Sequence, residues 1–401
     1  MNYQPSKEIL DKYASVLVNY GLNGCKGIKK GDVVFLQVPE CAKPMLFALR
    51  KAVLKSGGYP IIQYIPDGFS REFYEIASDD QLTFFPAKLL RGRIDQIDHI
   101  ISIEAEENPT ELKGIDPKKI MKSSKAFKPY MEWRTKKENE GKFTWTLALY
   151  GTEAMAKEAG LNLEEYWEQI IKACYLDEED PINKWKEIKK EIERIKKKLD
   201  SLKIEKLRIK GEKTDLVVGL GKNRKWLGGD GMNIPSFEVY ISPDYRKTEG
   251  HIQFTEPLYS YGNLIKNVYL EFKNGKVTKA SASEGEEVLK EMIATDEGSS
   301  RIGELSMTDF RLSRITKFMA TTLFDENVGG KYGNTHLALG KAYRDSYISD
   351  PSKVPEKNWD KMGYNDSVVH TDIVQTSNRE VTAYLEDGKE IVIYKDGKFT
   401  I

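Results

Sequence analysis

The chain has 401 residues, which is long enough for two or three domains. Its 62 basic and 62 acidic residues balance, so no bulk positive charge is present to attract nucleic acid or anionic lipid. The N-terminus lacks a signal pattern, no run of about 18 apolar residues occurs, and the three cysteines are scattered. These features predict a cytoplasmic protein with reduced thiols that binds neither nucleic acid nor membranes.

The first 150 residues are predicted to form an α/β domain. Apolar runs at residues 31–38, 59–64 and 98–103 have the character of buried strands, and residues 43–56 form an amphipathic helix between the first two. Short connections between strands and helices imply a mainly parallel sheet covered on both faces. No glycine-rich phosphate motif follows any of these strands, so a nucleotide site has no support. We interpret His99, which lies among apolar residues, as a hydrogen-bonded core histidine.

Residues 151–204 are predicted to be a helical connecting segment. Its second half has apolar residues spaced by three and four, with Lys and Glu between them, which predicts an amphipathic helix of about five turns over residues 185–202. Acidic residues alternate with the lysines along this helix. The pattern therefore indicates a solvated outer face rather than a surface for nucleic acid.

Residues 205–401 change to a two-residue period and are predicted to form an α+β domain with a mixed β-sheet. We expect strands at residues 207–210, 216–220, 237–241, 264–272 and 277–281, and a helix at residues 284–294. Asn-Gly or Asp-Gly pairs predict three tight hairpins, at residues 274–275, 387–388 and 396–397.

Two of the four histidines lie close to acids and a tyrosine in this last domain. His370 and Asp372 are two apart in a predicted strand, so their side chains leave the same face. His336 and Tyr343 are seven apart, and if residues 336–343 form a helix they share one face of it. Imidazoles and carboxylates together suit Zn, Co or Mn better than Ca or Mg. This combination indicates a hydrolytic metal site.

Two glutamates are candidates to complete that site. Glu238 lies in a strand bracketed by prolines, and Glu304 lies at the start of another short strand. An unpaired carboxylate on the inward side of a strand is costly, so each requires a cation or a hydrogen-bonding partner. A pair of cations needs such carboxylates to bridge and cap it.

The chain resembles the thermophilic metallo-aminopeptidases of the aminopeptidase T and aminopeptidase S type over essentially its whole length. The resemblance rests on sequence blocks in the right order, at residues 233–243, 285–289, 294–298, 302–305, 322–327, 336–343 and 365–372. It implies a homodimeric hydrolase that removes the N-terminal residue of peptides with a free N-terminus. It also implies two divalent metal ions per chain, Zn, Co or Mn, that activate a water molecule.

The resemblance also assigns roles to individual residues. The implied metal ligands are Glu238, Glu304, His336, Tyr343, His370 and Asp372. Tyr343 and Glu304 are also expected to act in catalysis, Tyr343 as a ligand or as a donor to the oxyanion. Whether Glu304 or Glu238 is the general base stays open. The acids Asp296 and Glu326, in neighbouring blocks, are interpreted as structural.

Two other functions remain open at this point. One is a dinuclear hydrolase that acts on esters or amides without a free amine. The other is a non-catalytic protein that keeps the fold and a metal. The resemblance to aminopeptidases is the stronger indication, because structural metal sites favour four closed ligands that often include cysteine.

Overall fold

The computed structural model describes residues 3–260 and 263–401, which form two compact units. The first unit contains Met1–Trp185 and Asp230–Ile234, and the second contains Lys186–Gly229 and Pro235–Ile401. Within the described ranges, every helix is too short or too polar to cross a membrane.

The first unit consists of helices around one parallel sheet. In chain order its elements are α1 (Lys7–Asn19), β1 (Val33–Pro39), η1 (Glu40–Ala42), α2 (Lys43–Lys55), β2 (Tyr59–Ile65), α3 (Phe69–Ile76), α4 (Asp79–Leu82), α5 (Ala87–Gln96), β3 (His99–Glu104), α6 (Pro117–Ala126), α7 (Lys128–Asn139), β4 (Thr144–Leu149), α8 (Glu153–Glu158), α9 (Leu163–Ala173) and β7 (Asn233–Ile234). Helix α10 (Pro181–Ser201) begins in this unit and continues into the second.

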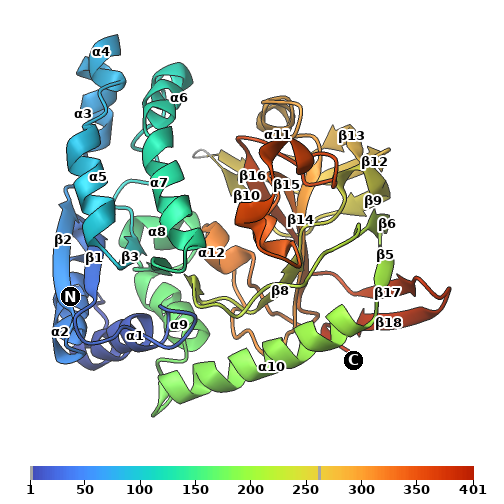
Figure 1. Cartoon of the computed structure of the whole chain (residues 1–401), viewed down its shortest axis with the longest axis horizontal. Helices are drawn as coiled ribbons and strands as arrows, with labels where there is room; N and C mark the ends of the chain where they lie inside the picture. The colour runs from blue at the N-terminus through green and yellow to red at the C-terminus, as the bar shows by residue number, and fades with distance from the viewer. Residues whose placement is uncertain (1–2, 261–262) are drawn as a thin grey trace. The chain divides into compact units, whose positions relative to one another are not determined.

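The sheet of the first unit has the strand order β2-β1-β3-β4-β7, and all its strands are parallel. Figure 1 shows β2, β1 and β3 of this sheet in that order. Its central strands are buried, and α2 packs on β1 while α1 packs on α2. The predicted strands near residues 31–38, 59–64 and 98–103, the predicted helix at 43–56 and the predicted α/β class are confirmed. Strand β2 forms one edge of this sheet and is the most exposed of its long strands.

His99 is a hydrogen-bonded core histidine, as predicted. It is 6% exposed, its Nδ1 lies 2.8 Å from Thr144 Oγ1, and its Nε2 lies 3.0 Å from Asp32 Oδ2. Both ring nitrogens therefore have a hydrogen-bond partner, and one of these partners is a carboxylate. The predicted helices after residue 151 are confirmed as α8, α9 and α10, although α10 ends at Ser201, one residue before Leu202.

The second unit is built mainly from β-strands. Besides most of α10 it contains β5 (Ile204–Gly211), β6 (Thr214–Gly219), β8 (Glu238–Ile241), η2 (Tyr245–Lys247), β9 (Thr248–Gln253), β10 (Leu258–Ser260), β11 (Asn263–Ile265), β12 (Tyr269–Lys273), β13 (Lys276–Ser281), α11 (Glu286–Ile293), β14 (Ile302–Thr308), α12 (Thr322–Asp325), β15 (Asn334–Gly340), η3 (Arg344–Ser346), η4 (Pro351–Lys353), η5 (Glu356–Asn358), β16 (His370–Gln375), β17 (Arg379–Leu385), β18 (Glu390–Lys395) and β19 (Lys398–Phe399).

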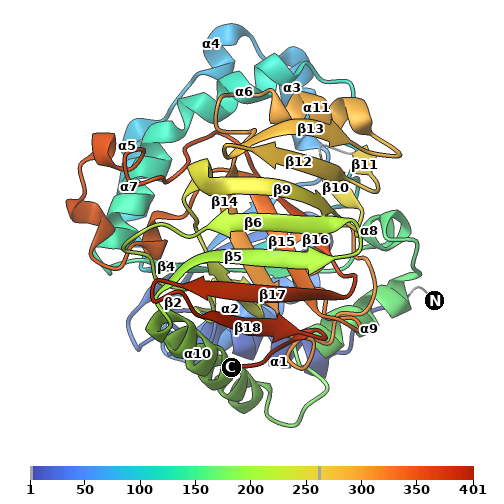
Figure 2. The ribbon, with the colours of Figure 1, turned by 90° about the vertical axis from the view of Figure 1, so that its right-hand side faces the viewer.

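Two antiparallel sheets pack against each other in the second unit. The larger has the order β13-β12-β9-β6-β5-β17-β18-β19, and the smaller has the order β16-β15-β14-β8. Figure 2 shows the strands of the smaller sheet running across the back of the larger one. Gln375 Nε2 donates to Thr214 Oγ1, and Tyr394 Oη donates to Thr308 O, both at 2.8 Å, so polar contacts join the two sheets. The predicted α+β class is confirmed.

The hairpins are confirmed, but one predicted strand is divided. Asn274 and Gly275 have φ values of 51° and 75°, as a tight turn between β12 and β13 requires. Residues 264–272, predicted as one strand, contain the end of β11 and most of β12. Asn267 lies between these strands with a φ of 54°, a left-handed conformation that interrupts an extended chain.

The predicted helix at residues 336–343 is wrong. His336 lies in strand β15, and Tyr343 lies beyond the end of that strand. All seven residues of β15 are buried, so the strand has no polar alternation, and its sequence cannot be told from a buried helix by its period. Gly340 ends the strand with a φ of 107°, where a Cβ atom would lie 2.0 Å from Val369 O.

Candidate metal centre

The smaller sheet of the second unit presents five predicted ligands on one face. Strand β14 carries Glu304. Two further residues of β14, which lie on the same face as Glu304, pair with His336 of β15 and with Glu238 of β8. On its other side, His336 pairs with a residue of β16. Asp372 and His370 lie two and four positions before that residue, so all three are on the same face of β16. Directly paired residues share a face of a sheet, as do alternate residues of one strand. The pairing register alone therefore brings these side chains together.

The side chains form two overlapping groups of three. In the first, His336 Nε2 lies 3.1 Å from Glu238 Oε1 and 3.4 Å from Glu304 Oε1. In the second, His370 Nε2 lies 3.6 Å from Glu304 Oε2 and 3.7 Å from Asp372 Oδ1. One potential ligand atom from each member lies within 4.8 Å of the others in both groups. Glu304 belongs to both groups, and each of its oxygens faces a different histidine.

The cluster is buried and incompletely hydrogen-bonded. Glu304 is 4% exposed and His336 is fully buried. Among the residues that the structure describes, Asp372 Oδ1 and His336 Nδ1 are buried atoms with no hydrogen-bond partner. Burying carboxylates without enough positive charge is costly, so the cluster is short of a cation.

The charges of the cluster change the proton affinities of its members. Burial raises the pKa of Glu304 to about 7, and the neighbouring Asp372 adds to this effect while His336 opposes it. Burial alone would lower the pKa of His336, but the carboxylates of Glu238 and Glu304 outweigh it and raise that pKa well above its ordinary value. Protons therefore supply positive charge at this position when no metal is bound.

The backbone near the end of β15 orients His370. Its Nδ1–H donates to Lys341 O at 2.8 Å, which leaves Nε2 directed at Glu304 and Asp372. Such a second hydrogen bond is the usual way in which a metal-binding histidine is fixed in one tautomer.

Tyr240 of strand β8 and Ser242, which follows the strand, hold Tyr343 beside the cluster. The backbone N–H of Tyr343 donates to Ser242 Oγ at 2.8 Å. The Tyr343 ring packs edge-on against His370, with centroids 4.9 Å apart, and against Tyr240, with centroids 5.7 Å apart. Although 43% of Tyr343 is exposed, burial of its phenol, together with the carboxylates of the cluster, raises its pKa well above the ordinary value. The phenol therefore keeps its proton.

Tyr240 and Ser242 were not predicted as site residues. Both alternate with Glu238 along the strand sequence, so they share its face, and this spacing was the available signal. Asp296 also acts near the site: it accepts hydrogen bonds from Val368 N and Ser367 Oγ, both at 2.8 Å, and so ties down the loop before His370.

Glu326 lies next to the cluster as well. It is 8% exposed, and burial together with the charges of Glu238 and Asp372 raises its pKa well above the ordinary value. It belongs to neither group of three. Its position depends on the packing of the loop that contains α12, which the sequence pattern did not indicate.

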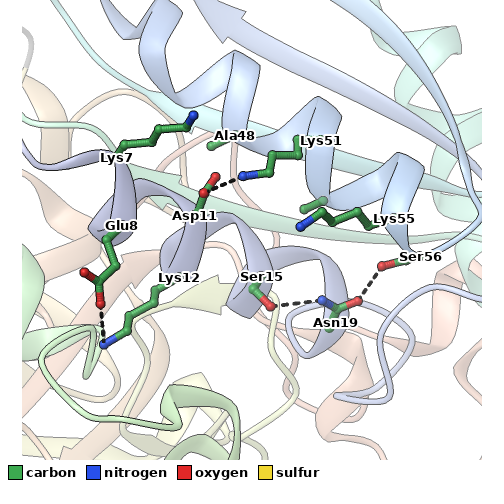
Figure 3. A pocket seen from close by; sticks show the side chains of 11 residues that line it. Lys7, Glu8, Asp11, Lys12, Ser15, Asn19, Ala48, Lys51, Lys55 and Ser56 are labelled. Atoms are coloured by element: carbon green, nitrogen blue, oxygen red, sulfur yellow. Dashed lines mark hydrogen bonds and ion pairs between the residues drawn. The ribbon is translucent and has the colours of Figure 1, made fainter.

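A hollow of about 760 Å³ between α1 and α2 in the first unit offers no comparable chemistry (Figure 3). Lys51 Nζ pairs with Asp11 Oδ2 at 2.6 Å, and Asn19 hydrogen-bonds to Ser15 and Ser56. Most polar groups that line the hollow thus satisfy one another.

A family model described as thermophilic metalloprotease (M29) matches residues 6–399 of this chain. The chain belongs to this family. The predicted family is therefore confirmed, and with it the prediction of a metal-dependent peptide hydrolase.

Family members of similar length resemble the chain from end to end. Aminopeptidase PepS of Streptococcus thermophilus is 28% identical, with 98% of both chains covered. Aminopeptidase T of Thermus thermophilus is also 28% identical, over 98% of this chain and 99% of the relative. The solved structure of wild-type AmpT from Thermus thermophilus superposes with a TM-score of 0.84 at 25% identity, over 98% of this chain and 100% of that chain.

Proposed function

We propose that this M29 family member is an aminopeptidase that binds two divalent metal ions and hydrolyses the first peptide bond of peptides with a free N-terminus. The observation that carries the proposal is the position of Glu304, whose two oxygens face two different histidines. A carboxylate shared between two groups of ligands is what a pair of adjacent cations requires. The relatives named aminopeptidase, matched over their whole length, support the choice of reaction.

The residues present fit such a metal pair. Glu238 and His336 would hold one ion, His370 and Asp372 would hold the other, and Glu304 would contact both. The set contains nitrogen and oxygen donors without thiolate, which suits Zn, Co or Mn. The unpartnered Asp372 Oδ1 and the surplus of buried carboxylates would be satisfied by the same ions. When bound, divalent ions of this kind polarise a carbonyl group and lower the pKa of water towards 7.

Tyr343 stabilises the oxyanion in the proposed reaction. Its phenol keeps its proton because burial and the neighbouring carboxylates raise its pKa. A protonated phenol can donate to the carbonyl oxygen as negative charge develops there, and this hydrogen bond is strongest in the transition state. Ser242 and Tyr240 hold the tyrosine in place for this role.

Two buried acids of the cluster can carry the proton of the attacking water. Burial raises the pKa of Glu304 to about 7 and raises that of Glu326 well above its ordinary value, so both carboxylates hold a proton more tightly than an exposed glutamate does. Glu326 lies outside both groups of three. The Glu326→Gln variant therefore tests proton transfer without removing a proposed ligand: it should keep its metals and lose turnover if Glu326 is the base.

We also propose that the enzyme is a cytoplasmic homodimer. Cys25, Cys41 and Cys174 form no disulfide, which suits a reducing compartment. In the first unit Phe69, Phe73 and Phe84 are 63%, 44% and 69% exposed, and such apolar groups favour association. Phe85 differs, because it packs against Phe127 and Trp133.

A substrate panel tests the function directly. Amino-acid 4-nitroanilides should be hydrolysed, and the same compounds with a blocked amine should not. A chelator should abolish this activity, and Zn²⁺, Co²⁺ or Mn²⁺ should restore it, because nitrogen and oxygen donors release and exchange metals. Equal hydrolysis of blocked substrates would identify a hydrolase of another class. Full activity in metal-free protein would contradict the metal mechanism.

A further inference from the structure

Two of the proposed metal ligands lie at the ends of strands in the smaller sheet of the second unit. The order of this sheet is β16-β15-β14-β8, so β8 and β16 are its outermost strands, and Glu238 and His370 are their first residues. Glu238 pairs with Thr308, the last residue of β14. Pairing at the end of a ladder holds a residue less firmly than pairing in its middle. Both side chains therefore need contacts from outside the ladder to keep one position.

The two ligands obtain these contacts from different parts of the chain. His370 donates from Nδ1 to Lys341 O, and Asp296 holds the loop that precedes it. At Glu238, a hydroxyl group has the corresponding place. Ser236, two residues before Glu238, donates from Oγ to Glu238 Oε2 at 3.1 Å. Each outermost ligand is thus held by a hydrogen bond that the other does not share.

The other carboxylate oxygen of Glu238 faces the cluster. Oε1 lies 3.1 Å from His336 Nε2 and 3.5 Å from Ser306 Oγ, and a hydrogen bond at the second distance is weak. Ser236 thus occupies one oxygen and leaves the other beside His336. The terminal torsion of a glutamate otherwise varies broadly, so the hydrogen bond from Ser236 restricts the rotation of this carboxylate.

Asn327 fixes the backbone between Ser236 and Glu238. Phe237 N donates to Asn327 Oδ1 at 2.7 Å, and Asn327 is fully buried. The orientation of this amide is itself fixed, because Asn327 Nδ2 donates to Leu323 O of α12 at 3.2 Å. The hydroxyl of Ser236 is therefore presented to Glu238 from a backbone that is anchored to a second part of the unit.

We propose that Ser236 is a positioning residue for the ion beside His336: its hydroxyl holds Oε2 of Glu238, so that Oε1 is the oxygen offered to that ion. The inference rests on the proposed metal pair and deepens it, because it makes the two positions depend on different residues. A residue that hydrogen-bonds to a metal ligand sets metal affinity without touching the metal. Removal of the Ser236 hydroxyl should therefore weaken the ion beside His336 and leave the ion beside His370 unchanged.

Calorimetric titration of metal-free protein with Co²⁺ tests the proposal in the His370→Ala variant, in which only the group around His336 should bind an ion. Adding Ser236→Ala should weaken this remaining ion about 10–100-fold. Adding Ser236→Thr should leave its affinity unchanged, because threonine keeps the hydroxyl and suits extended backbone. The matched control is Ser352→Ala, which removes a hydroxyl that donates to Asp350 Oδ1 at 2.6 Å, outside both groups of ligands. It should leave the affinity unchanged.

A second titration separates positioning from a general loss of structure. In the otherwise wild-type chain, Ser236→Ala should still bind two ions, only one of them more weakly. Asp296→Ala, added to His370→Ala, should leave the remaining ion unchanged, because Asp296 holds the loop of the other ligand. Equal weakening of both ions by Ser236→Ala, or no weakening of either, would overturn the proposal. If the wild-type chain does not bind two ions, the metal pair itself is wrong, and this inference with it.

Discussion

Two buried histidines, one in each unit, lie in very different surroundings. His99 in the parallel sheet has a partner for each ring nitrogen and one carboxylate, that of Asp32. His336 in the smaller antiparallel sheet has three carboxylates within 4 Å of Nε2 and no partner for Nδ1 among the described residues. Burial of a histidine is therefore no sign of function by itself. The surplus of carboxylates around His336 is what points to a cation.

The two units also differ in the kind of group that each leaves unsatisfied. The second unit buries charges without enough countercharge, and the first unit leaves apolar side chains in water at β2, α2 and α3. Both arrangements are costly in an isolated metal-free chain. In the proposed function, metal ions would relieve the first and a second protein surface would relieve the second.

The largest expected effect is that of removing the shared carboxylate. Glu304→Gln should lower kcat/KM by about 10³-fold or more, because several kcal/mol of metal-derived stabilisation of the transition state are lost. Asp32→Asn is the matched control in the first unit: it disturbs the partner of His99 but should leave activity within about threefold of wild type. Steady-state kinetics on an amino-acid 4-nitroanilide measures both. If both variants lose the same factor in kcat/KM, the surroundings of His336 are no more important for activity than those of His99.

Tyr343→Phe should have the next largest effect. It should lower kcat by about 10²–10³-fold with little change in KM, the usual cost of one oxyanion donor. Both metals should remain bound. If this variant instead lacks one metal, Tyr343 is a ligand and a metal ion alone must stabilise the oxyanion.

The stability of metal-free protein should fall as the pH rises. The pKa of Glu304 is about 7 in the folded chain and near 4.5 ordinarily, so the folded state binds the proton more tightly than the unfolded state. This contribution to the free energy of unfolding is complete below about pH 4.5 and is lost as the pH rises through 7. Its size is at most about 3–4 kcal/mol. The raised pKa of His336 acts in the same direction.

Chemical denaturation at several pH values measures this slope. Metal-loaded protein should show the opposite trend, because protons compete with metal for the same atoms. Asp32→Asn should retain the slope of the metal-free protein, and Glu304→Gln should weaken it. A metal-free protein that becomes more stable between pH 5 and 8 would contradict the account.

A smaller effect is expected at the loop before His370. Asp296→Ala removes the acceptor of Ser367 and Val368, so metal affinity should fall about 10–100-fold, as for other residues that orient metal ligands. The control is Asp350→Ala, which removes a similar loop-capping carboxylate that accepts from Ser352 N at 3.0 Å. Metal titration compares the two variants, and equal affinities would assign Asp296 no part in positioning His370.

Elements with strong local signals could be predicted from the sequence. Strands β1, β2 and β3 are apolar runs with turn residues at their ends, and the hairpin at Asn274 and Gly275 needs a positive φ that its residues permit. The sequence blocks also identified the family and the six candidate site residues. These predictions depend on patterns a few residues long or on resemblance, and neither requires the tertiary packing.

The errors occurred where tertiary contacts decide the structure. His336 and Tyr343 are spaced as on a helix, but β15 is buried along its whole length and Gly340 ends it against Val369 O. Tyr343 is instead held by Ser242, the residue that follows strand β8. The proximity of Glu326 to the cluster likewise arises from loop packing, which no local period encodes.

Counting bound metal tests the central claim most directly. Elemental analysis of protein dialysed against Co²⁺ should give two ions per chain for wild type, because the groups around His336 and His370 are each proposed to hold one. It should give one ion for His370→Ala, in which the group around His336 is intact. Two ions in both proteins, or one ion in both, would contradict a pair of sites joined through Glu304.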